Sequence, residues 1–230
     1  MNRTLEDRLG MGLLLIVFGW LLVRSLKGMA ALVAAHDTVP MWELILLSRV
    51  SNLVFLGMIV WFTATRLPAR NAATGLMPRL VAIAGTFVMM LVAVAAPVEV
   101  GPVQRVVSTV LVVLGTVLSI LCLTRLGRSF SVVASARALV TAGPYRIVRH
   151  PLYAAELVAV LGVTMSNGSA AAYALGLSCL AFQIARARLE EKVLAETFPE
   201  YAGYARRVPM LIPGLNGLLP RRAAPVGESA

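Results

Sequence analysis

The stretch from Leu157 to Ala185 reads LVAVLGVTMSNGSAAAYALGLSCLAFQIA and holds 29 residues without a charge. One straight helix of that length, at about 1.5 Å per residue, would be longer than the roughly 30 Å hydrocarbon core of a bilayer. Ser166-Asn167-Gly168-Ser169 lies within it, and Asn, Gly and Ser are typical turn residues. The stretch therefore predicts a hairpin of two short helices, roughly Pro151 to Met165 and Ala170 to Ala185.

The composition excludes an ordinary soluble globular protein. Hydrophobic residues make up 59% of the chain, charged residues 14%, and the mean hydropathy is +0.82. The other charge-free stretches are Leu9 to Val23, Val50 to Thr65, Leu80 to Val98, and Val106 to Thr124. We expect the first span to continue toward Ala35 and the second to begin near Trp42, because each is otherwise short for a bilayer.

These spans predict an all-α fold, a polytopic transmembrane helix bundle with a C-terminal helical hairpin. Residues 1–124 are expected to form about four N-terminal spans. Residues 125–213 are expected to form a cytosolic loop, the hairpin and a charged helix, and residues 214–230 a disordered tail. The first span could imitate a cleavable signal peptide. Arg24 and Lys27 fall between its apolar run and any cleavage site, which favours an uncleaved helix.

The charges predict the orientation of the bundle. The net charge is +10, and a hairpin places 17 of the 21 Lys and Arg residues on the side of the N-terminus. The positive-inside rule then predicts cytoplasmic N- and C-termini and a multi-pass integral membrane protein. No basic stripe interleaved with aromatic residues suggests nucleic-acid binding. Cys122 and Cys179 lie in apolar runs without metal-ligand or disulfide spacing, so we expect neither a metal site nor a disulfide bond.

Polar residues are densest just before the hairpin, where Gly143 to Glu156 reads GPYRIVRHPLYAAE. Pro151 suits the first position of a helix, which makes His150 the expected N-cap. Tyr153 and Glu156 are three residues apart and share one helix face. A carboxylate at this depth must face protein or a polar cavity. Glu156 is expected to form an ion pair with Arg146 or Arg149, to contact a ligand, or both.

A second acidic cluster, Glu190 and Glu191, follows the hairpin in the sequence ARARLEEKVLAETF from Ala185 to Phe198. One interpretation is an exposed charged helix in which Arg186 and Glu190 pair at i,i+4. The hairpin suggests another, because it returns this helix to the membrane face where His150 lies. Helix amides with Arg149 and His150 would then suit an anionic group, and the carboxylates an ammonium.

Three stretches carry a family resemblance: LGRSF from Leu126, LVTAGPYRIVRHPLYAAE from Leu139, and ARLEEKVLAETFPEYAGYARRVPMLIP from Ala187. Together they resemble the isoprenylcysteine carboxyl methyltransferase and phospholipid N-methyltransferase superfamily over about the last 90 residues. The resemblance implies an enzyme that binds S-adenosylmethionine in a cytosolic pocket and receives its acceptor from the bilayer. The residues implied to bind the cofactor are Tyr145, Arg149, His150, Tyr153, Glu156, Glu190 and Glu191.

The acceptor is expected to be hydrophobic or lipid-like, within membrane lipids, and carboxyl O-methylation is slightly favoured over amine N-methylation. A carboxylate needs orientation by a cation, for which Arg149, Arg206 and Arg207 are candidates, while an amine needs a base such as His150 or Glu156. Tyr204 is a further candidate for substrate binding. The alternatives are a membrane NADPH-dependent sterol-type reductase, which predicts basic residues for a 2'-phosphate, and a small transporter, suggested by Arg49 and Glu156.

Overall fold

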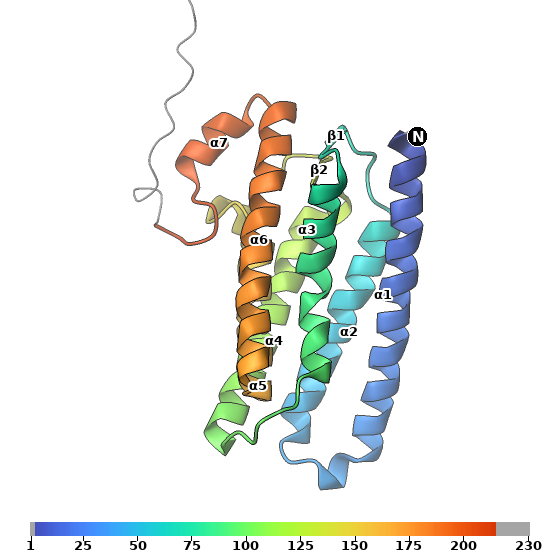
Figure 1. Cartoon of the computed structure of the whole chain (residues 1–230), viewed down its shortest axis with the longest axis vertical. Coiled ribbons are helices and arrows are strands. Elements are labelled where there is room, and N and C mark those ends of the chain that lie inside the picture. Colours follow the sequence, from blue (N-terminus) through green and yellow to red (C-terminus); the bar gives the residue numbers. More distant parts are fainter. Residues whose placement is uncertain (1–2, 215–230) are drawn as a thin grey trace, which may run out of the picture.

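The computed structural model describes residues 3–214, and it is almost entirely helical. The helices are α1 (Arg3–Ala34), α2 (Trp42–Ala64), α3 (Leu76–Phe87), α4 (Pro102–Leu126), α5 (Pro151–Asn167), α6 (Ala170–Thr197) and α7 (Tyr201–Arg207). Two strands of two residues each, β1 (Asn71–Ala72) and β2 (Ser135–Ala136), pair antiparallel. The long helices lie side by side, and α7 lies beside the C-terminal end of α6, on the outside of the bundle (Figure 1). The predicted all-α class is confirmed.

Five segments of the described chain are long and apolar enough to cross a membrane: α1 from Arg8, α2, Leu76–Val94, α4 with its extension to Ser129, and α6. The helix α5 is shorter, at 17 residues. As predicted, the first span continues to Ala34 and the second begins at Trp42. Residues 1–124 therefore contribute four helices long enough to span, while the division of the chain into functional regions stays a prediction.

The predicted hairpin is confirmed. Helix α5 ends at Asn167, and Gly168 adopts a left-handed conformation with φ of 72°. Ser169 then caps α6, its hydroxyl accepting a hydrogen bond from the amide of Ala172 at 3.2 Å. The same hydroxyl donates to the Asn167 side chain at 2.6 Å. The turn therefore satisfies some of its own polar groups, and α6 runs on without a break to Thr197.

The third span differs from the expected Leu80 to Val98. Helix α3 ends at Phe87 and tightens into a 3₁₀ segment, Val88–Val94, after which Ala95 is extended. Pro97 disfavours a helical conformation for the residue before it, so the helix cannot reach Val98. The backbone amide of Val98 instead donates to the carbonyl of Asn167 at 2.9 Å, which joins this loop to the hairpin turn.

Small residues bring α4 and α5 into close contact. A Cβ on Gly115 would lie 2.3 Å from the backbone nitrogen of Ala159, and one on Gly162 would lie 2.6 Å from the carbonyl oxygen of Ser108. Close approach through small residues is typical of helix pairs in membranes. There the hydrophobic effect does not drive the helices together, so close packing must. This packing fixes α5, and with it the start of that helix, where the polar residues gather.

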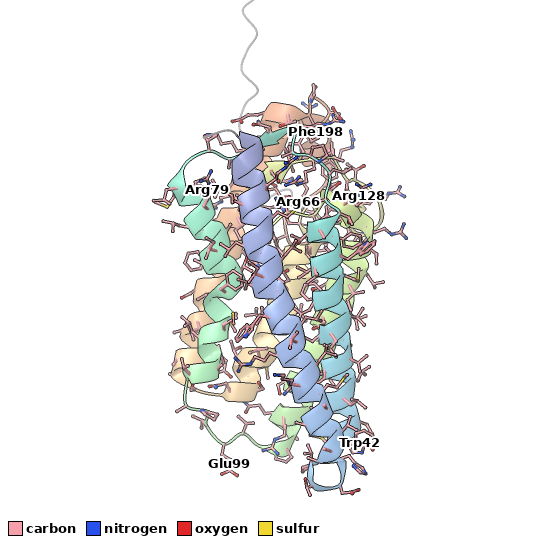
Figure 2. The ribbon with its side chains drawn as sticks, turned by 90° about the vertical axis from the view of Figure 1, so that its right-hand side faces the viewer. Trp42, Arg66, Arg79, Glu99, Arg128 and Phe198 are labelled. Carbon is pink, nitrogen blue, oxygen red and sulfur yellow. The ribbon has the colours of Figure 1, made fainter. Side chains whose placement is uncertain are left out.

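The two ends of the bundle differ in charge. Arg66, Arg79, Arg128 and Phe198 lie at one end, whereas Trp42 and Glu99 lie at the other (Figure 2). The N-terminal end of α1, the strands and α7 share the basic end (Figure 1). This is the arrangement that the charge pattern predicted, and its assignment to the cytoplasm stays a prediction. Residues 215–230, with most of the predicted disordered tail, lie outside the described residues.

Candidate functional site

The start of α5 is held by the segment that follows α7. The backbone amide of Arg149 donates to the carbonyl of Pro209 at 2.8 Å, and that of His150 donates to Met210 at 3.0 Å. Pro151 occupies the first helical position and His150 the N-cap, as predicted. The His150 side chain makes no capping hydrogen bond, however, and its ring instead faces the glutamates of α6. The sequence thus placed the backbone of His150 correctly, and the structure adds the position of its imidazole.

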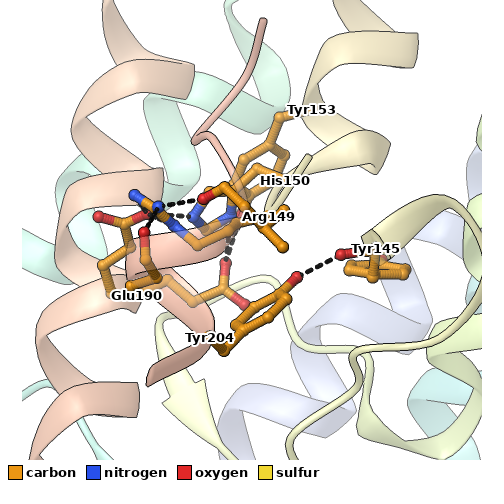
Figure 3. A network of polar contacts seen from close by, with 9 residues as sticks. Tyr145, Arg149, His150, Tyr153, Glu190 and Tyr204 are labelled. Carbon is orange, nitrogen blue, oxygen red and sulfur yellow. Dashed lines mark hydrogen bonds and ion pairs between the residues drawn. The ribbon is translucent and has the colours of Figure 1, made fainter. Parts of the chain in front are cut away.

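Arg149 ties the start of α5 to both α6 and α7. Its Nε and one terminal nitrogen each lie 2.6 Å from Oε1 of Glu191. The other terminal nitrogen donates to the carbonyls of Ala205 and Val208, at 2.8 and 2.5 Å. Charge-assisted bonds of this kind are about twice as strong as neutral ones. Four of the bonds that a guanidinium can make are therefore already made within the chain (Figure 3).

His150 and Tyr153 extend this network to the second glutamate. Nε2 of His150 lies 3.3 Å from Oε1 of Glu191, and Nδ1 lies 3.8 Å from Oε2 of Glu190. The hydroxyl of Tyr153 donates to Glu190 at 3.0 Å. The two rings stack, with centroids 5.5 Å apart and planes within 4° (Figure 3). The hairpin therefore brings the two polar clusters of the sequence into direct contact, as predicted.

Beneath Tyr153 lies a charged residue that the sequence analysis treated as exposed. Arg186 is only 7% exposed, and its guanidinium carbon lies 4.8 Å from the centre of the Tyr153 ring. It donates to the side-chain carbonyl of Gln183 at 2.9 Å and to the backbone carbonyl of Val132 at 3.3 Å. The exposed helix with a surface pair of Arg186 and Glu190, one of the two interpretations of the sequence, is therefore not what forms. The signal that sequence reasoning could have used is the lone amide of Gln183 in an apolar run.

Glu156 belongs to this buried group. Its carboxylate accepts a hydrogen bond from the amide nitrogen of Gln183 at 2.6 Å. The ion pair considered from the sequence, with Arg146 or Arg149, is not the contact observed, because Arg149 binds Glu191. Gln183 thus bridges a carboxylate and a guanidinium that are both on the hairpin.

A pocket that is partly open to solvent lies over this network. Its lining combines apolar and polar residues: Leu126, Ser129, Phe130, Ser131, Ser135, Ala138, Leu139, Val140, Tyr145, Arg149, His150, Leu152, Tyr153, Glu190, Leu194, Tyr201 and Tyr204. Six predicted site residues are among them, namely Tyr145, Arg149, His150, Tyr153, Glu190 and Tyr204. Glu191 lies behind Arg149, Glu156 lies beside Gln183, and Arg206 and Arg207 are exposed residues outside this lining.

Three tyrosines of the pocket are buried and remain protonated over a wide pH range. Burial raises the pKa of Tyr145, and the neighbouring Glu190 raises it further. Burial also raises the pKa of Tyr201, and it raises that of Tyr204 to about 12. The hydroxyl of Tyr204 donates to the backbone carbonyl of Tyr145 at 2.6 Å (Figure 3). The pocket therefore offers neutral hydroxyl donors beside its one directly facing carboxylate.

The segment that builds this pocket is similar to known proteins. A family model for phospholipid methyltransferase matches residues 103–201. The cobalt-zinc-cadmium resistance protein CzcN of Cupriavidus metallidurans is 43% identical over 79 residues, which cover 34% of this chain and 37% of that protein. The nickel-cobalt-cadmium resistance protein NccN of Alcaligenes xylosoxydans xylosoxydans is 39% identical over 79 residues, with the same shares.

A plant enzyme matches over a longer segment. Protein-S-isoprenylcysteine O-methyltransferase B of Arabidopsis thaliana is 33% identical over 113 residues, which cover 46% of this chain and 57% of that protein. The chain thus spans less than two thirds of each of these relatives. The resemblance to the superfamily is confirmed for the C-terminal region.

Proposed function

We propose that this chain, whose residues 103–201 match the phospholipid methyltransferase family, transfers a methyl group from S-adenosylmethionine to a hydrophobic acceptor in the membrane. The observation that carries the proposal is the position of Glu190. Its carboxylate lines the pocket, with a neutral Tyr153 hydroxyl and His150 as its nearest partners. Within residues 3–214 no guanidinium or ammonium binds this carboxylate, and a partly buried carboxylate of this kind favours a cationic ligand.

The groups around the pocket fit S-adenosylmethionine. The cofactor carries an ammonium, a sulfonium, a carboxylate, hydroxyls and a flat base, and its positive charges suit Glu190. Tyrosine hydroxyls, His150 and the apolar residues Leu139 and Leu194 suit the remaining groups. A dinucleotide such as NADPH fits less well, because its phosphates would meet the Glu190 carboxylate. Arg149 offers them little, since its donors are bound to Glu191 and two carbonyls.

When bound, the cofactor supplies a methyl group on a sulfonium, which leaves as a neutral thioether. The residues of this chain are proposed to position and desolvate the reactants rather than to form a covalent bond. Glu190 binds a positive group of the cofactor, and Tyr153 holds Glu190 in place. Arg149 and Glu191 fix the start of α5 against α6, which sets the position of His150.

The acceptor is proposed to enter from the bilayer side of the pocket. Leu126 at the end of α4, Phe130 and Leu152 form an apolar part of the lining that suits a hydrocarbon chain. We keep carboxyl O-methylation ahead of amine N-methylation because the plant relative's name states that reaction. A carboxylate would be oriented by backbone amides in the first turn of α5 or by Arg206 and Arg207 at the end of α7. An amine would use His150 as its base.

Binding and transfer are measured on the purified chain. Calorimetric titration in detergent is expected to show binding of S-adenosylhomocysteine and none of NADPH. Glu190→Gln should weaken that binding about tenfold, the effect of losing one charge-assisted contact of about 1.4 kcal/mol. Glu196→Gln, an exposed residue on the same helix, is the matched control and should bind as the unaltered chain does.

In proteoliposomes, radiolabelled methyl groups should appear on a prenylcysteine carboxyl in preference to phosphatidylethanolamine. Methyl transfer to the phospholipid alone would reverse the proposed order of acceptors. Binding of NADPH but not of S-adenosylhomocysteine would overturn methyl transfer. Binding of neither would leave the transporter as the better hypothesis.

A further inference from the structure

Two hydroxyl groups in the pocket lining have no hydrogen-bond partner among the residues that the structure describes. They are Oγ of Ser135, at the start of β2, and Oη of Tyr201, at the start of α7. Both oxygen atoms are buried, and Tyr201 as a residue is only 4% exposed. A buried polar group without a partner destabilises a protein by about 1–3 kcal/mol. Most such groups in natural proteins are satisfied, so two in one pocket call for a physical reason.

Neighbouring hydroxyls of the same pocket are satisfied within the chain. Ser131 donates to the carbonyl of Val133 at 2.9 Å, Tyr153 donates to Glu190, and Tyr204 donates to the carbonyl of Tyr145. These three hydroxyls have partners, whereas those of Ser135 and Tyr201 are buried without one in the described part of the chain.

The Tyr201 ring packs among apolar and aromatic side chains, while its hydroxyl is influenced by the charges of Arg149, Glu190 and Glu191. Tyr201 packs in a buried cluster with Ala136, which follows Ser135 directly, and with Val193 and Tyr204. Leu139 and Leu194 pack against the same cluster and also line the pocket. The two hydroxyls therefore lie in a wall that would favour a flat, apolar-faced group, and they would meet that group with polar atoms at its edge.

We propose that Ser135 and Tyr201 form a subsite that recognises the edge of a purine base, the adenine of the cofactor whose binding is proposed above. Each hydroxyl can donate one hydrogen bond and accept others. The adenine edge combines an amino donor with ring-nitrogen acceptors, so both hydroxyls gain the partners that they lack. The faces of the base contact Leu139, Leu194 and the Tyr204 ring. A ribose fits this wall less well, because it carries hydroxyls and no flat apolar face.

Because the two hydroxyls have no partners among residues 3–214, removing them should not lower the stability of the unliganded protein. Removing a buried hydroxyl that has no partner relieves a desolvation cost, so Ser135→Ala and Tyr201→Phe should leave the thermal midpoint of the unliganded protein unchanged or raise it. Ser131→Ala is the matched control on the same wall. It loses a real hydrogen bond and should lower the midpoint.

Ligand binding should change in the opposite direction. Calorimetric titration of each variant with S-adenosylhomocysteine should show affinities about three- to tenfold lower for Ser135→Ala and Tyr201→Phe, the effect of one hydrogen bond. The inosine analogue, in which a carbonyl replaces the amino group, should bind the unaltered chain more weakly than the adenosine compound. In the double variant this preference should disappear.

The outcomes separate the two proposals. Normal binding by the unaltered chain with unchanged affinities in both variants would overturn the subsite and leave the proposed function standing. Weaker binding with the adenosine preference retained would overturn the assignment to the purine edge. A lowered midpoint in the unliganded variants would show that the hydroxyls have partners and would also overturn it. Failure of the unaltered chain to bind S-adenosylhomocysteine would overturn the proposed function and the subsite together.

Discussion

The buried guanidinium of Arg186 is expected to be the most sensitive structural charge in the hairpin. In Arg186→Met the ring of Tyr153 loses its cation, and the side-chain carbonyl of Gln183 loses its donor. Glu156 keeps its bond to Gln183 but no longer has a cation behind that amide. The variant therefore removes one half of a bridged charge pair and leaves the other half in place.

The magnitude follows from these contacts. A desolvated cation–π contact is worth up to about 2 kcal/mol, and an unsatisfied buried acceptor costs about 1–3 kcal/mol. Polar contacts in membrane proteins are on average weaker, about 0.6 kcal/mol. We therefore expect Arg186→Met to lower the free energy of unfolding by about 3 kcal/mol, near the lower limit for a broken buried pair. Arg188→Met changes an exposed residue on the same helix and should stay within about 0.5 kcal/mol.

The assay is denaturant unfolding in mixed micelles, arranged as a double-mutant cycle with Glu156→Gln. The double variant removes both charges, so it should be less destabilised than the sum of the single variants by about 1–2 kcal/mol. Arg186→Lys keeps the charge without the planar fork and should recover only part of the loss. Additive effects of Arg186→Met and Glu156→Gln would refute the reasoning, because they would show that Gln183 does not couple Arg186 to Glu156.

Three further expectations follow from the packing and the network. Gly115→Ala should lower the free energy of unfolding by about 1–3 kcal/mol, because the added Cβ would lie 2.3 Å from a backbone atom of α5. Gly57→Ala, which has open space around its Cβ, should be neutral or slightly stabilising. Equal effects of the two variants in thermal or denaturant unfolding would contradict the packing argument. Arg149→Lys should weaken S-adenosylhomocysteine binding at least tenfold, because an ammonium cannot reproduce the two contacts to Glu191. Charge-assisted contacts of this kind are worth about 1.5–3 kcal/mol. An unchanged calorimetric affinity would show that Arg149 and Glu191 do not belong to the site. Burial raises the pKa of Tyr204 to about 12, so the folded state favours the protonated hydroxyl. The free energy of unfolding should therefore fall as the pH rises from about 10, the ordinary tyrosine pKa, toward 12. In Tyr204→Phe the part of this pH dependence that Tyr204 causes should be absent.

The sequence by itself determined the layout of the backbone. The length of the charge-free run and the residues at its centre required a hairpin, and Gly168 and Ser169 form the turn that their chemistry predicts. Bilayer thickness fixes helix lengths, so the span boundaries could be read from composition, apart from the early end of α3 before Pro97. The same reasoning placed Glu190 and Glu191 beside the start of α5.

Only the tertiary structure decided which polar groups pair across the hairpin. Glu156 could have reached Arg146, Arg149 or a ligand from the sequence alone, and it instead binds Gln183 on the facing helix. Arg186 looked like a surface residue and is buried under Tyr153. Rotation and register of two helices set such contacts, and a shift of one residue turns a side chain by about 100°. That choice depends on side-chain packing between helices, which local sequence patterns do not encode.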